Sequence, residues 1–586
     1  MIRRAAPIIV LLFMTSCAYA YTFHVVPGDA IQDSIDAASS GDTVLVADGT
    51  YNESITLKHR VTVCSINGSA STTINGGNSL RTVYSPDTAD SLNFGGDVAG
   101  FKIDGGTDCG LWFSDSDHVY VQDIRIISDP SIACMYIVGC PNTSRFKNIV
   151  VSSGITGYTK ALYLDQSDSE LEDIFIEDAE YTAILVNRGS PDFSELTVKE
   201  CGEGLQAYEA GVTIHEDSRF EDCTTGLFAY AYGEYAGLGL DHVTLYNCTT
   251  GVSVMANPDE IATVVADSCL FDECDDGLVL VDAYGDIEGC TFEDLDDDGI
   301  LISGYEACGV IGGSGSDANT FTNIDGVAIH VSTGGYADID RNIFDYVDET
   351  AILVDSGNDD TTIDDCDMDG SGGCFEGINT SGSGTFATVR DCALYDYEAH
   401  VSPSPRAAVA YKAMACYGTS SDNGNNSFYD NSTDLNYQNR DASPDSLYAV
   451  KNWWGENPPD ASSFGGRTGY IVYEPYLTSS PRLIPTVVED VPIPDTPMLT
   501  SIHPSPSRGT VEFTYGLPCA GRVSIEVYDL TGRLVQRVYD GERPKGNHTA
   551  IWDGVSIEGV RAPSGIYMCR FGTTEASEAL RFVLLR

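Results

Sequence analysis

The sequence has very few basic residues for its length. Its 586 residues include 31 Lys and Arg, of which eight are Lys, against 88 Asp and Glu, so the formal net charge is −57. Affinity for nucleic acids depends on Lys and Arg that neutralise phosphates, and an acidic chain gains nothing from binding a polyanion. We therefore exclude nucleic acid as a partner. A hydrophobic fraction of 42% is enough for a sizeable core and argues against global disorder.

Long apolar runs are absent after the first 20 residues, and no segment is long enough to span a bilayer. Residues 1–20 combine Arg3 and Arg4, a short apolar run and an Ala-Tyr-Ala site at 18–20, which is typical of a secretory signal peptide cut after Ala20. An imperfect lipoprotein-type site ending at Cys17 is the alternative. We expect an exported protein, extracellular or on the outer cell surface, with no transmembrane segment.

The segment 100–400 is built from a repeated unit. Each unit has a four-residue apolar strand, such as 183–186, 205–208 or 278–281, and a second alternating segment, such as 193–198. A polar turn that ends in Gly follows. Short strands with a period of two, recurring at a nearly constant spacing along the chain, fit the coils of a parallel β-helix, in which each coil buries its inner face against its neighbours.

Cysteines recur at equivalent places in this repeat. One set is Cys201, Cys223, Cys248 and Cys274; a second context contains Cys269, Cys290, Cys366 and Cys392. We interpret them as inward-facing ladders of small apolar side chains. Stacked free thiols are favoured over disulfides between adjacent coils, because parallel side chains give poor disulfide torsions.

Both ends of the repeat region carry segments that cap it. Residues 30–39 predict a short amphipathic helix over the first coil, and Trp453 and Trp454 are expected to cover the last one, with sugar stacking as the alternative. The opening pattern consists of Val26, Gly28, Ile31, Gln32, Ile35, residues 41–44, residues 49–51 and Glu53. Together with the Asn-Trp-Trp-Gly of 452–455, it resembles the right-handed β-helix proteins of the pectin-lyase-like superfamily. The resemblance implies the fold and no particular activity.

A different composition begins after five prolines in residues 481–497, which predict an extended linker. Residues 485–586 hold 12 acids and 10 bases, so nearly all the negative charge precedes them. Short β-runs in residues 498–586 predict an immunoglobulin-like sandwich. Its matching segments are 521–523, 527–533, 552–554, 564–567 and 583–586. They resemble type IX secretion sorting domains and the related hook-capping-type module, although residues 503–506 depart from the usual Pro-Asn-Pro-Phe. The resemblance implies secretion machinery as a partner.

The predicted fold class is therefore all-β, with a right-handed parallel β-helix solenoid followed by a small immunoglobulin-like β-sandwich. The expected organisation is a signal peptide at 1–20, the solenoid with its helical cap at 21–480, the linker at 481–497 and the sorting module at 498–586.

Stacked acidic residues suggest a cation site. Asp276, Asp298 and Asp325 each stand directly before the Gly that opens a coil, and Asp359 and Asp360 belong to another crowded coil. Like charges about 4.8 Å apart repel each other, and a hard cation with oxygen ligands relieves that repulsion. We hypothesise that these five residues bind Ca²⁺, the only cofactor that we expect. The alternative is a solvated acidic face.

Tyrosines near the ends of the inward strands are candidates for sugar stacking, namely Tyr232, Tyr284, Tyr305 and Tyr336. A scatter of partly buried tyrosines is the alternative.

Recognisable catalytic sets are missing. The nearest approach to the polygalacturonase-like series is at residues 357–360, without its Gly-His-Gly or Arg-Ile-Lys, and His215, His242 and His330 have no metal-ligand spacing. We favour a non-catalytic protein that binds polysaccharide or another surface partner. The alternative is a polysaccharide lyase or glycoside hydrolase, with catalytic residues that the sequence does not identify.

Overall fold

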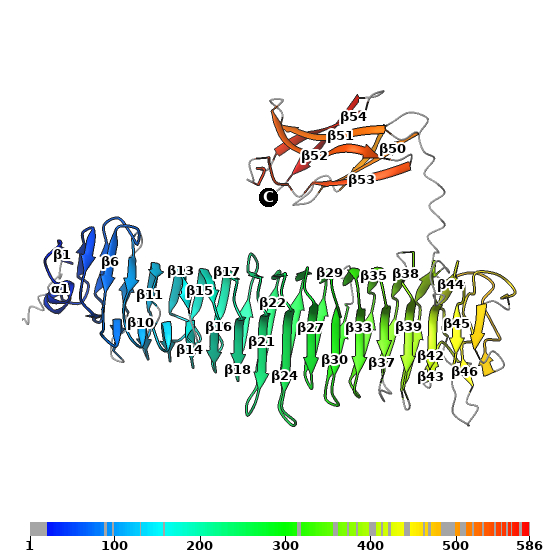
Figure 1. Ribbon diagram of the computed structural model, residues 1–586, viewed down its shortest axis with the longest axis horizontal. Coiled ribbons are helices and arrows are strands. Elements are labelled where there is room, and N and C mark those ends of the chain that lie inside the picture. The colour runs from blue at the N-terminus through cyan, green and yellow to red at the C-terminus, as the bar shows by residue number, and fades with distance from the viewer. Residues whose placement is uncertain are drawn as a thin grey trace, which may run out of the picture. The chain divides into compact units, whose positions relative to one another are not determined.

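The chain forms two compact units, residues 1–482 and 483–586, in a computed structural model (Figure 1). The structure describes residues 20–86, 91–95, 99–128, 130–155, 159–312, 318–355, 361–371, 374–382, 385–397, 406–411, 414–419, 423–438, 446–460, 463–466, 470–481, 498–503, 511–518, 521–529, 533–543, 546–552, 554–557, 561–563, 565–573 and 577–584. No helix within these ranges is long and apolar enough to cross a membrane.

The first unit is a right-handed parallel β-helix whose coils follow one another from the blue to the yellow end of Figure 1. Each coil contributes a strand to sheet 1, then to sheet 2, then to sheet 3. Within the described ranges, sheet 1 stacks 17 strands: β4 (Ile55–Thr56), β7 (Arg81–Ser85), β10 (Cys109–Ser114), β12 (Ala133–Val138), β14 (Lys160–Asp165), β16 (Thr182–Asn187), β18 (Glu203–Tyr208), β21 (Thr225–Ala231), β24 (Thr250–Ala256), β27 (Asp276–Val281), β30 (Ile300–Ser303), β33 (Val327–Ser332), β36 (Thr350–Val354), β39 (Glu376–Ser381), β42 (Arg406–Tyr411), β45 (Leu435–Tyr437) and β47 (Phe464–Gly466).

Sheets 2 and 3 share four long strands, β11 (Tyr120–Ile126), β13 (Arg145–Ile155), β15 (Glu170–Ala179) and β17 (Asp192–Lys199). Sheet 2 also contains β1 (Thr22–Val25), β2 (Thr43–Val46), β5 (Thr62–Ser65), β8 (Asn93–Phe94), β19 (Gly211–Ile214), β22 (Ala236–Asp241), β25 (Ala262–Asp267), β28 (Tyr284–Glu288), β31 (Cys308–Ile311), β34 (Tyr336–Asp340), β37 (Thr361–Asp364), β40 (Phe386–Arg390), β43 (Met414–Cys416), β46 (Leu447–Tyr448) and β48 (Ile471–Val472). Sheet 3 also contains β3 (Gly49–Tyr51), β6 (Thr72–Asn75), β9 (Phe101–Asp104), β20 (Arg219–Glu221), β23 (Thr244–Tyr246), β26 (Leu270–Asp272), β29 (Thr291–Leu295), β32 (Thr320–Ile324), β35 (Ile343–Val347), β38 (Asp367–Asp369), β41 (Ala393–Tyr395) and β44 (Ser427–Tyr429).

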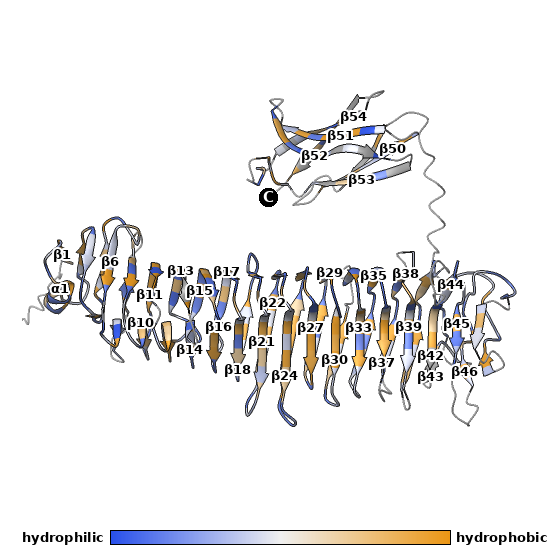
Figure 2. Cartoon of the chain, viewed as in Figure 1, coloured by the Kyte–Doolittle hydropathy of each residue, from blue (hydrophilic) through white to orange (hydrophobic). Residues whose placement is uncertain are grey.

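Alternation along each short strand places every second side chain inside the coil. Strands such as β27 and β30 are therefore largely hydrophobic in Figure 2, whereas the turns at the ends of the coils are largely hydrophilic. Inside sheet 3, Phe271, Phe292, Phe321 and Phe344 form one stack with ring centroids 4.5, 4.7 and 5.0 Å apart. The stack continues the same inward position from coil to coil, which confirms the repeat that the sequence predicts.

The corners between sheets account for part of the excess of Asp. Of 32 described non-glycine residues with a left-handed backbone, 13 are Asp and four are Asn. Asp123, Asn148, Asp173 and Glu195, for example, occupy the same bend in the four long strands, with φ between 51° and 56°. Asp and Asn tolerate this conformation better than most residues. Part of the acidic composition is therefore tied to the number of corners.

The amphipathic helix is present as α1 (Ile31–Ala37), shorter than predicted, and it packs on β1, β2 and β4. Ile31 and Ile35 are its buried residues. The backbone N–H groups of Ile31 and Gln32 donate to the carboxylate of Glu53, at 2.8 and 3.1 Å. Helix α1 therefore caps the first coil.

At the other end, Trp454 is 2% exposed and stacks on Phe428 with ring centroids 4.8 Å apart. It also contacts Phe464 edge-on. Trp454 thus covers the last sheet 3 position as expected, while its neighbour Trp453 is only partly buried. The position argues against sugar stacking by Trp454, because its ring is used in the core.

Cysteines form the predicted inward ladder. Backbone hydrogen bonds join neighbouring coils beside the thiols. Thr224 N–H donates to Cys201 O, and Thr249 N–H donates to Cys223 O. The thiols of this column are buried. No disulfide joins any cysteine in the described part of the chain. In the second column two cysteines, Cys269 and Cys290, are followed by two asparagines, and Asn319 Nδ2 donates to Asn342 Oδ1 at 3.0 Å.

The second unit is a small antiparallel β-sandwich, as predicted. One sheet contains β49 (Met498–His503), β50 (Val511–Leu517) and β53 (Gly546–Trp552). The other contains β51 (Gly521–Asp529), β52 (Leu534–Arg543), β54 (Gly565–Thr573) and β55 (Ser577–Leu584). Trp552 packs edge-on against Phe582 between them, with centroids 5.7 Å apart. Residues 482–497, which include most of the predicted linker, lie outside the described residues.

Candidate functional site

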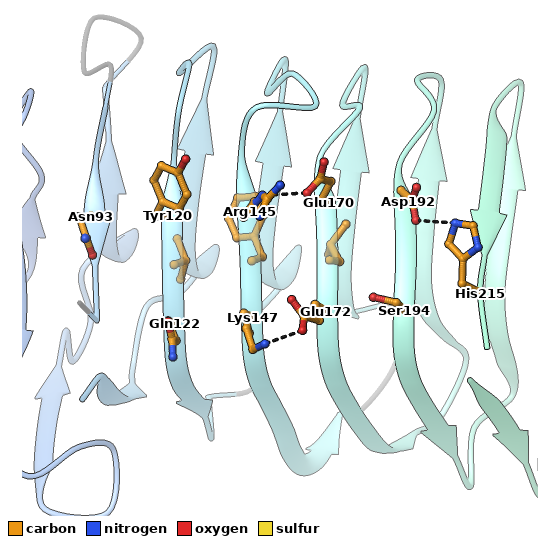
Figure 3. A pocket seen from close by; sticks show the side chains of 13 residues that line it. Asn93, Tyr120, Gln122, Arg145, Lys147, Glu170, Glu172, Asp192, Ser194 and His215 are labelled. Atoms are coloured by element: carbon orange, nitrogen blue, oxygen red, sulfur yellow. Dashed lines mark hydrogen bonds and ion pairs between the residues drawn. The ribbon is translucent and has the colours of Figure 1, made fainter. Parts of the chain in front are cut away.

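A groove with a volume of about 470 Å³ lies on the outer face of sheet 2 (Figure 3). We call it the sheet 2 groove. The side chains that point into it come from β8, β11, β13, β15, β17 and the residue that follows β19: Asn93, Tyr120, Gln122, Arg145, Lys147, Glu170, Glu172, Asp192, Ser194 and His215.

Strand register arranges these side chains in two parallel rows. The first row runs through Tyr120, Arg145, Glu170 and Asp192, and the second through Gln122, Lys147, Glu172 and Ser194. The residue between the two rows on each strand, such as Phe146 or Leu171, points inward and is buried. Neighbouring strands lie about 4.8 Å apart, so each row presents one polar group at that interval.

Opposite charges pair across adjacent coils in the groove. Arg145 Nε lies 2.8 Å from Glu170 Oε2, Lys147 pairs with Glu172, and His215 Nε2 lies 3.1 Å from Asp192 Oδ1. All six side chains are at least 40% exposed. Exposed ion pairs contribute roughly 0–1 kcal/mol. A ligand can therefore replace one partner of each pair at little cost.

Basic residues are unevenly distributed along the solenoid. Residues 81–219 contain nine Lys and Arg with 24 acids, whereas residues 220–340 contain no Lys or Arg with another 24 acids. The groove lies within the first segment. It is therefore placed where the solenoid is less negative than in the coils that follow.

A second polar cluster lies on the outer face of sheet 1. His330 Nδ1 lies 3.1 Å from Asp298 Oδ2, and His330 Nε2 lies 3.6 Å from Asp355 Oδ2. Ser332 Oγ donates to Asp355 Oδ1 at 2.8 Å. Burial by itself would lower the pKa of His330, but the hydrogen bond to Asp298 and the charges of both carboxylates outweigh it and raise that pKa. The cluster thus favours an imidazolium between two carboxylates.

Asp276 belongs to the same cluster. It lies in register one coil before Asp298, whose backbone N–H faces Asp276 Oδ1 at 3.4 Å. Burial, followed by the charge of Asp297, raises the pKa of the Asp276 carboxyl. A carboxyl with a raised pKa beside a second carboxylate is an arrangement suited to proton transfer.

The proposed calcium ligands are only partly brought together. Asp276 and Asp298 are neighbours, but Val327 occupies the next place in the column and donates its N–H to Asp298 Oδ1 at 3.2 Å. Asp325 instead bonds through its backbone to Leu295 O and is exposed. Asp359 and Asp360 lie outside the described residues.

No group of three or more His, Cys, Asp or Glu side chains is placed to hold a metal ion within the described part of the chain. At Asp298, the repulsion that motivated the calcium hypothesis is partly relieved by His330. Calcium binding stays a prediction.

The four candidate tyrosines do not form one row. Tyr284 and Tyr336 share an outer row of sheet 2, with Cys308 between them. Tyr232 and Tyr305 lie in turns and are 59% and 83% exposed.

An aromatic column that the sequence analysis missed lies on the outer face of sheet 1. Tyr84, Trp112, Tyr136 and Tyr163 are in register there. The guanidinium of Arg81 lies 3.6 Å from the Trp112 ring centroid. Each of these four aromatic residues occupies the outward-facing position in the middle of an apolar strand, in successive coils. That recurrence is the sequence signal that marks the column.

Comparisons with known proteins agree with the fold. Residues 182–314 and 276–443 match the family described as right handed beta helix region, and residues 504–577 match the FlgD Ig-like domain. No curated protein sequence matches the chain.

Among solved structures, latent PorU from Porphyromonas gingivalis is 21% identical, with 19% of this chain and 10% of that chain covered and a TM-score of 0.14. The chain thus spans a tenth of the length of PorU. The N-terminal fragment of bacteriophage Phi29 gene product 12 is 12% identical, with 72% and 84% covered and a TM-score of 0.30. The tailspike protein gp49 from Acinetobacter baumannii bacteriophage Fri1, a capsular polysaccharide depolymerase, is 9% identical, with 96% and 80% covered and a TM-score of 0.18.

Proposed function

We propose that this is a secreted or cell-surface β-helix protein that binds a polysaccharide, or another surface partner of similar chemistry, without cleaving it. The observation that supports this proposal most is the sheet 2 groove. Its two rows of polar side chains repeat at the coil spacing over several successive coils. A linear polymer with repeated hydroxyl or charged groups matches such a regular array better than a compact ligand does.

The composition of the groove supports the same proposal. Tyr120 is 46% exposed and lines the groove, while Gln122 and Asn93 supply amide donors and acceptors. Sugar faces pack on aromatic rings, and hydroxyl groups bond to amides and carboxylates. The exposed ion pairs of Arg145 and Lys147 provide cations that a charged substituent of the polymer reaches by displacing Glu170 or Glu172.

Binding is tested first by screening the purified full chain against a panel of immobilised polysaccharides. Each polymer that retains the protein is then titrated by calorimetry. The R145A/K147A double variant is expected to weaken binding at least tenfold. Arg219→Ala is the matched control, because Arg219 also forms an exposed pair, with Glu221 at 3.0 Å, but lies on sheet 3. Binding that survives the double variant unchanged would place the partner elsewhere.

A polysaccharide lyase or glycoside hydrolase is the second candidate function, and the cluster of Asp276, Asp298 and His330 favours it. Glycoside cleavage uses a protonated acid and a second carboxylate on the same site. Asp276, with its raised pKa, suits the acid, and Asp298, held by His330, suits the carboxylate. Release of unsaturated or reducing ends by the full chain, lost in D276N, would establish this function in place of non-catalytic binding.

We also propose that the C-terminal sandwich directs the chain to secretion machinery, and that residues 1–20 act as an export signal. The match to the FlgD Ig-like domain supports the identification of the module as Ig-like. Its role in secretion is a matter for experiment. Deleting residues 498–586 in a host with type IX secretion is expected to retain the solenoid inside the cell. Unchanged appearance of the truncated chain in the medium would contradict the sorting role.

A further inference from the structure

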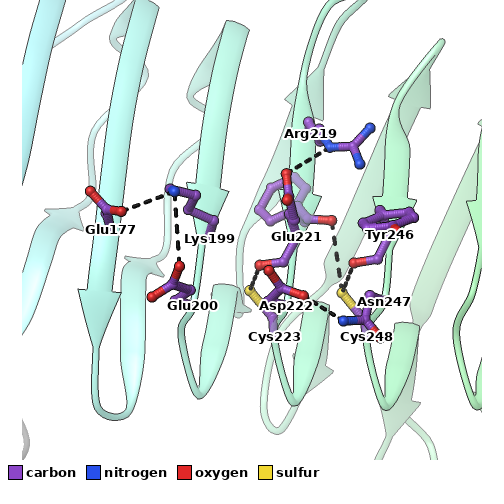
Figure 4. A network of polar contacts seen from close by, with 11 residues as sticks. Glu177, Lys199, Glu200, Arg219, Glu221, Asp222, Cys223, Tyr246, Asn247 and Cys248 are labelled. Atoms are coloured by element: carbon purple, nitrogen blue, oxygen red, sulfur yellow. Dashed lines mark hydrogen bonds and ion pairs between the residues drawn. The ribbon is translucent and has the colours of Figure 1, made fainter.

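A column of four buried cysteines runs along one corner of the solenoid. Cys201, Cys223, Cys248 and Cys274 are 5%, 3%, 1% and 0% exposed. Each follows a residue with a left-handed backbone, with φ of 54°, 55°, 50° and 53° in chain order, so the four thiols leave the corner in the same way. Figure 4 shows Cys223 and Cys248 side by side beneath the polar side chains of this corner.

Each of the first three thiols in the column is anchored to backbone oxygen of its own coil. Cys201 donates to Lys199 O at 3.1 Å, Cys223 to Glu221 O at 3.4 Å and Cys248 to Tyr246 O at 3.5 Å. Cys248 also reaches a carbonyl of the preceding coil, Phe220 O, at 3.8 Å. The sulfur atoms therefore lie at the boundary between coils, within the buried core.

Neighbouring thiols in the column also contact one another. Cys223 lies within hydrogen-bonding reach of both Cys201 and Cys248, and Cys248 within reach of Cys274. These contacts raise the pKa of Cys223 and lower the pKa of Cys248. A thiol beside a neighbour with thiolate character is the starting arrangement for thiol–disulfide chemistry.

The corner is covered by a polar network that is part of the solvent-facing surface. Lys199 lies between Glu177 and Glu200, at 2.9 and 3.9 Å, and Asn247 donates to Asp222 (Figure 4). These groups surround the column, whose most exposed member is Cys201, at 5%.

We propose that the cysteine column is a site of oxidative modification, in which adjacent thiols form disulfides that covalently join successive coils. The proposal is independent of the proposed polysaccharide binding. The free thiols that the sequence favours are the reduced state of this column. The expected pairs on oxidation are Cys201 with Cys223 and Cys248 with Cys274. Adjacent parallel strands place their Cα atoms within the range that a disulfide spans, and the two thiols must rotate out of their parallel arrangement to reach the torsion angle of the bond.

The oxidant is a small-molecule disulfide such as oxidised glutathione. A thiolate of the column attacks one of its sulfurs, forming a mixed disulfide and releasing one glutathione thiolate. The neighbouring thiol loses its proton and attacks the protein sulfur, which forms the bond between coils and releases the second glutathione. Two protein thiols are thus oxidised for each oxidised glutathione that is reduced.

Each disulfide closes a loop of one coil, from Cys201 to Cys223 or from Cys248 to Cys274. Closing these loops restricts the unfolded chain and stabilises the folded one. We therefore expect the oxidised full chain to have a higher Tm than the reduced chain. A second contact pair, Cys269 with Cys290 in the neighbouring column, is expected to react in the same way.

The experiment equilibrates the folded full chain with oxidised glutathione, alkylates the remaining thiols under denaturing conditions and maps disulfide-linked peptides by mass spectrometry. Peptides that join adjacent members of the column are expected. Cys109 and Cys569 are the controls, because their neighbours in register are Arg81 and Ala133, and Val527 and Leu580, and not other cysteines. Both are expected to remain alkylatable.

A Cys223→Ser variant sharpens the test. It is expected to keep the Cys248–Cys274 peptide and to leave Cys201 alkylatable, with circular dichroism showing that the fold is retained. Four fully alkylatable thiols in the folded wild-type chain would overturn the proposal. So would glutathione adducts that never resolve, or linked peptides that join non-adjacent cysteines.

Discussion

Gly277 and Phe292 meet in the interior of the solenoid, where a Cβ added to Gly277 would lie 2.8 Å from Phe292 Cδ1 and 2.5 Å from the backbone oxygen of Gly299. The same relationship recurs at Gly251 with Phe271 and at Gly299 with Phe321. Glycine at these three positions is therefore required by the aromatic stack inside sheet 3 and by the backbone of the next coil, and not by a left-handed backbone.

Gly277→Ala is expected to destabilise the solenoid by about 1–3 kcal/mol, the usual cost of overpacking a core. Gly239→Ala is the matched control, because its added Cβ would meet nothing closer than 3.7 Å, at Thr213. Urea unfolding of both variants measures the difference. Equal stabilities would contradict the assignment of the turn glycines to core packing.

His330 predicts a specific pH dependence of stability. The pKa of His330 is higher in the folded chain than in an unfolded one, where it is about 6.5. The contribution of His330 to folding stability is therefore complete below about pH 6.5 and is lost as pH rises through the folded pKa. The groups that face it are Asp297, Asp298 and Asp355. His330→Gln is expected to cost about 1 kcal/mol at pH 5.5.

The cost of the same substitution is expected to be smaller at pH 9 than at pH 5.5, since the wild-type imidazole loses its proton as pH rises through its folded pKa. Chemical denaturation of the two chains at both pH values tests this. A cost that grows with pH would show that the ion pairs with Asp298 and Asp355 do not stabilise the fold.

Asp434 predicts a stabilising substitution. Burial raises its pKa to about 6, although hydrogen bonds from Ser463 and from Asn431 Nδ2, the latter at 3.0 Å, oppose the shift. The contribution of Asp434 to folding stability is therefore complete below about pH 3.9 and is lost as pH rises through about 6. Asp434→Asn removes the cost of a buried charge and is expected to stabilise the chain at pH 7.5 by at most about 2–3 kcal/mol.

Below pH 4 the gain from Asp434→Asn is expected to vanish, because the wild-type carboxyl is already neutral. Differential scanning calorimetry at pH 3.8 and 7.5 makes the comparison. An equal gain at both pH values would mean that Asn improves packing and does not remove a charge.

The inward half of the solenoid was predictable from sequence because its chemistry repeats. Apolar residues such as Ile300 recur at every coil, and the Gly and Cys positions beside them follow the same period. Most outward residues carry no such period, the aromatic column of sheet 1 being an exception. Arg145 and Glu170, which the register pairs across the groove, have nothing in the sequence to mark them as neighbours.

Coil length explains why Asp325 lies outside the column of Asp276 and Asp298. Leu278 is in register with Ile300, and Ile300 is in register with Ile329, so the second of these two coils is the longer one. The added length displaces Asp325 from the column. The position of an Asp relative to the Gly therefore shows that it belongs to a turn. It does not show which residue of the neighbouring coil the Asp contacts.

The sheet 2 groove is the centre of the functional account, and titration of the full chain with a retained polysaccharide tests it most directly. Wild type and Arg219→Ala are expected to bind with equal Kd, and R145A/K147A at least tenfold more weakly, with no new chain ends released from the polymer. Equal binding by all three proteins would contradict the account, and so would cleavage of the polymer.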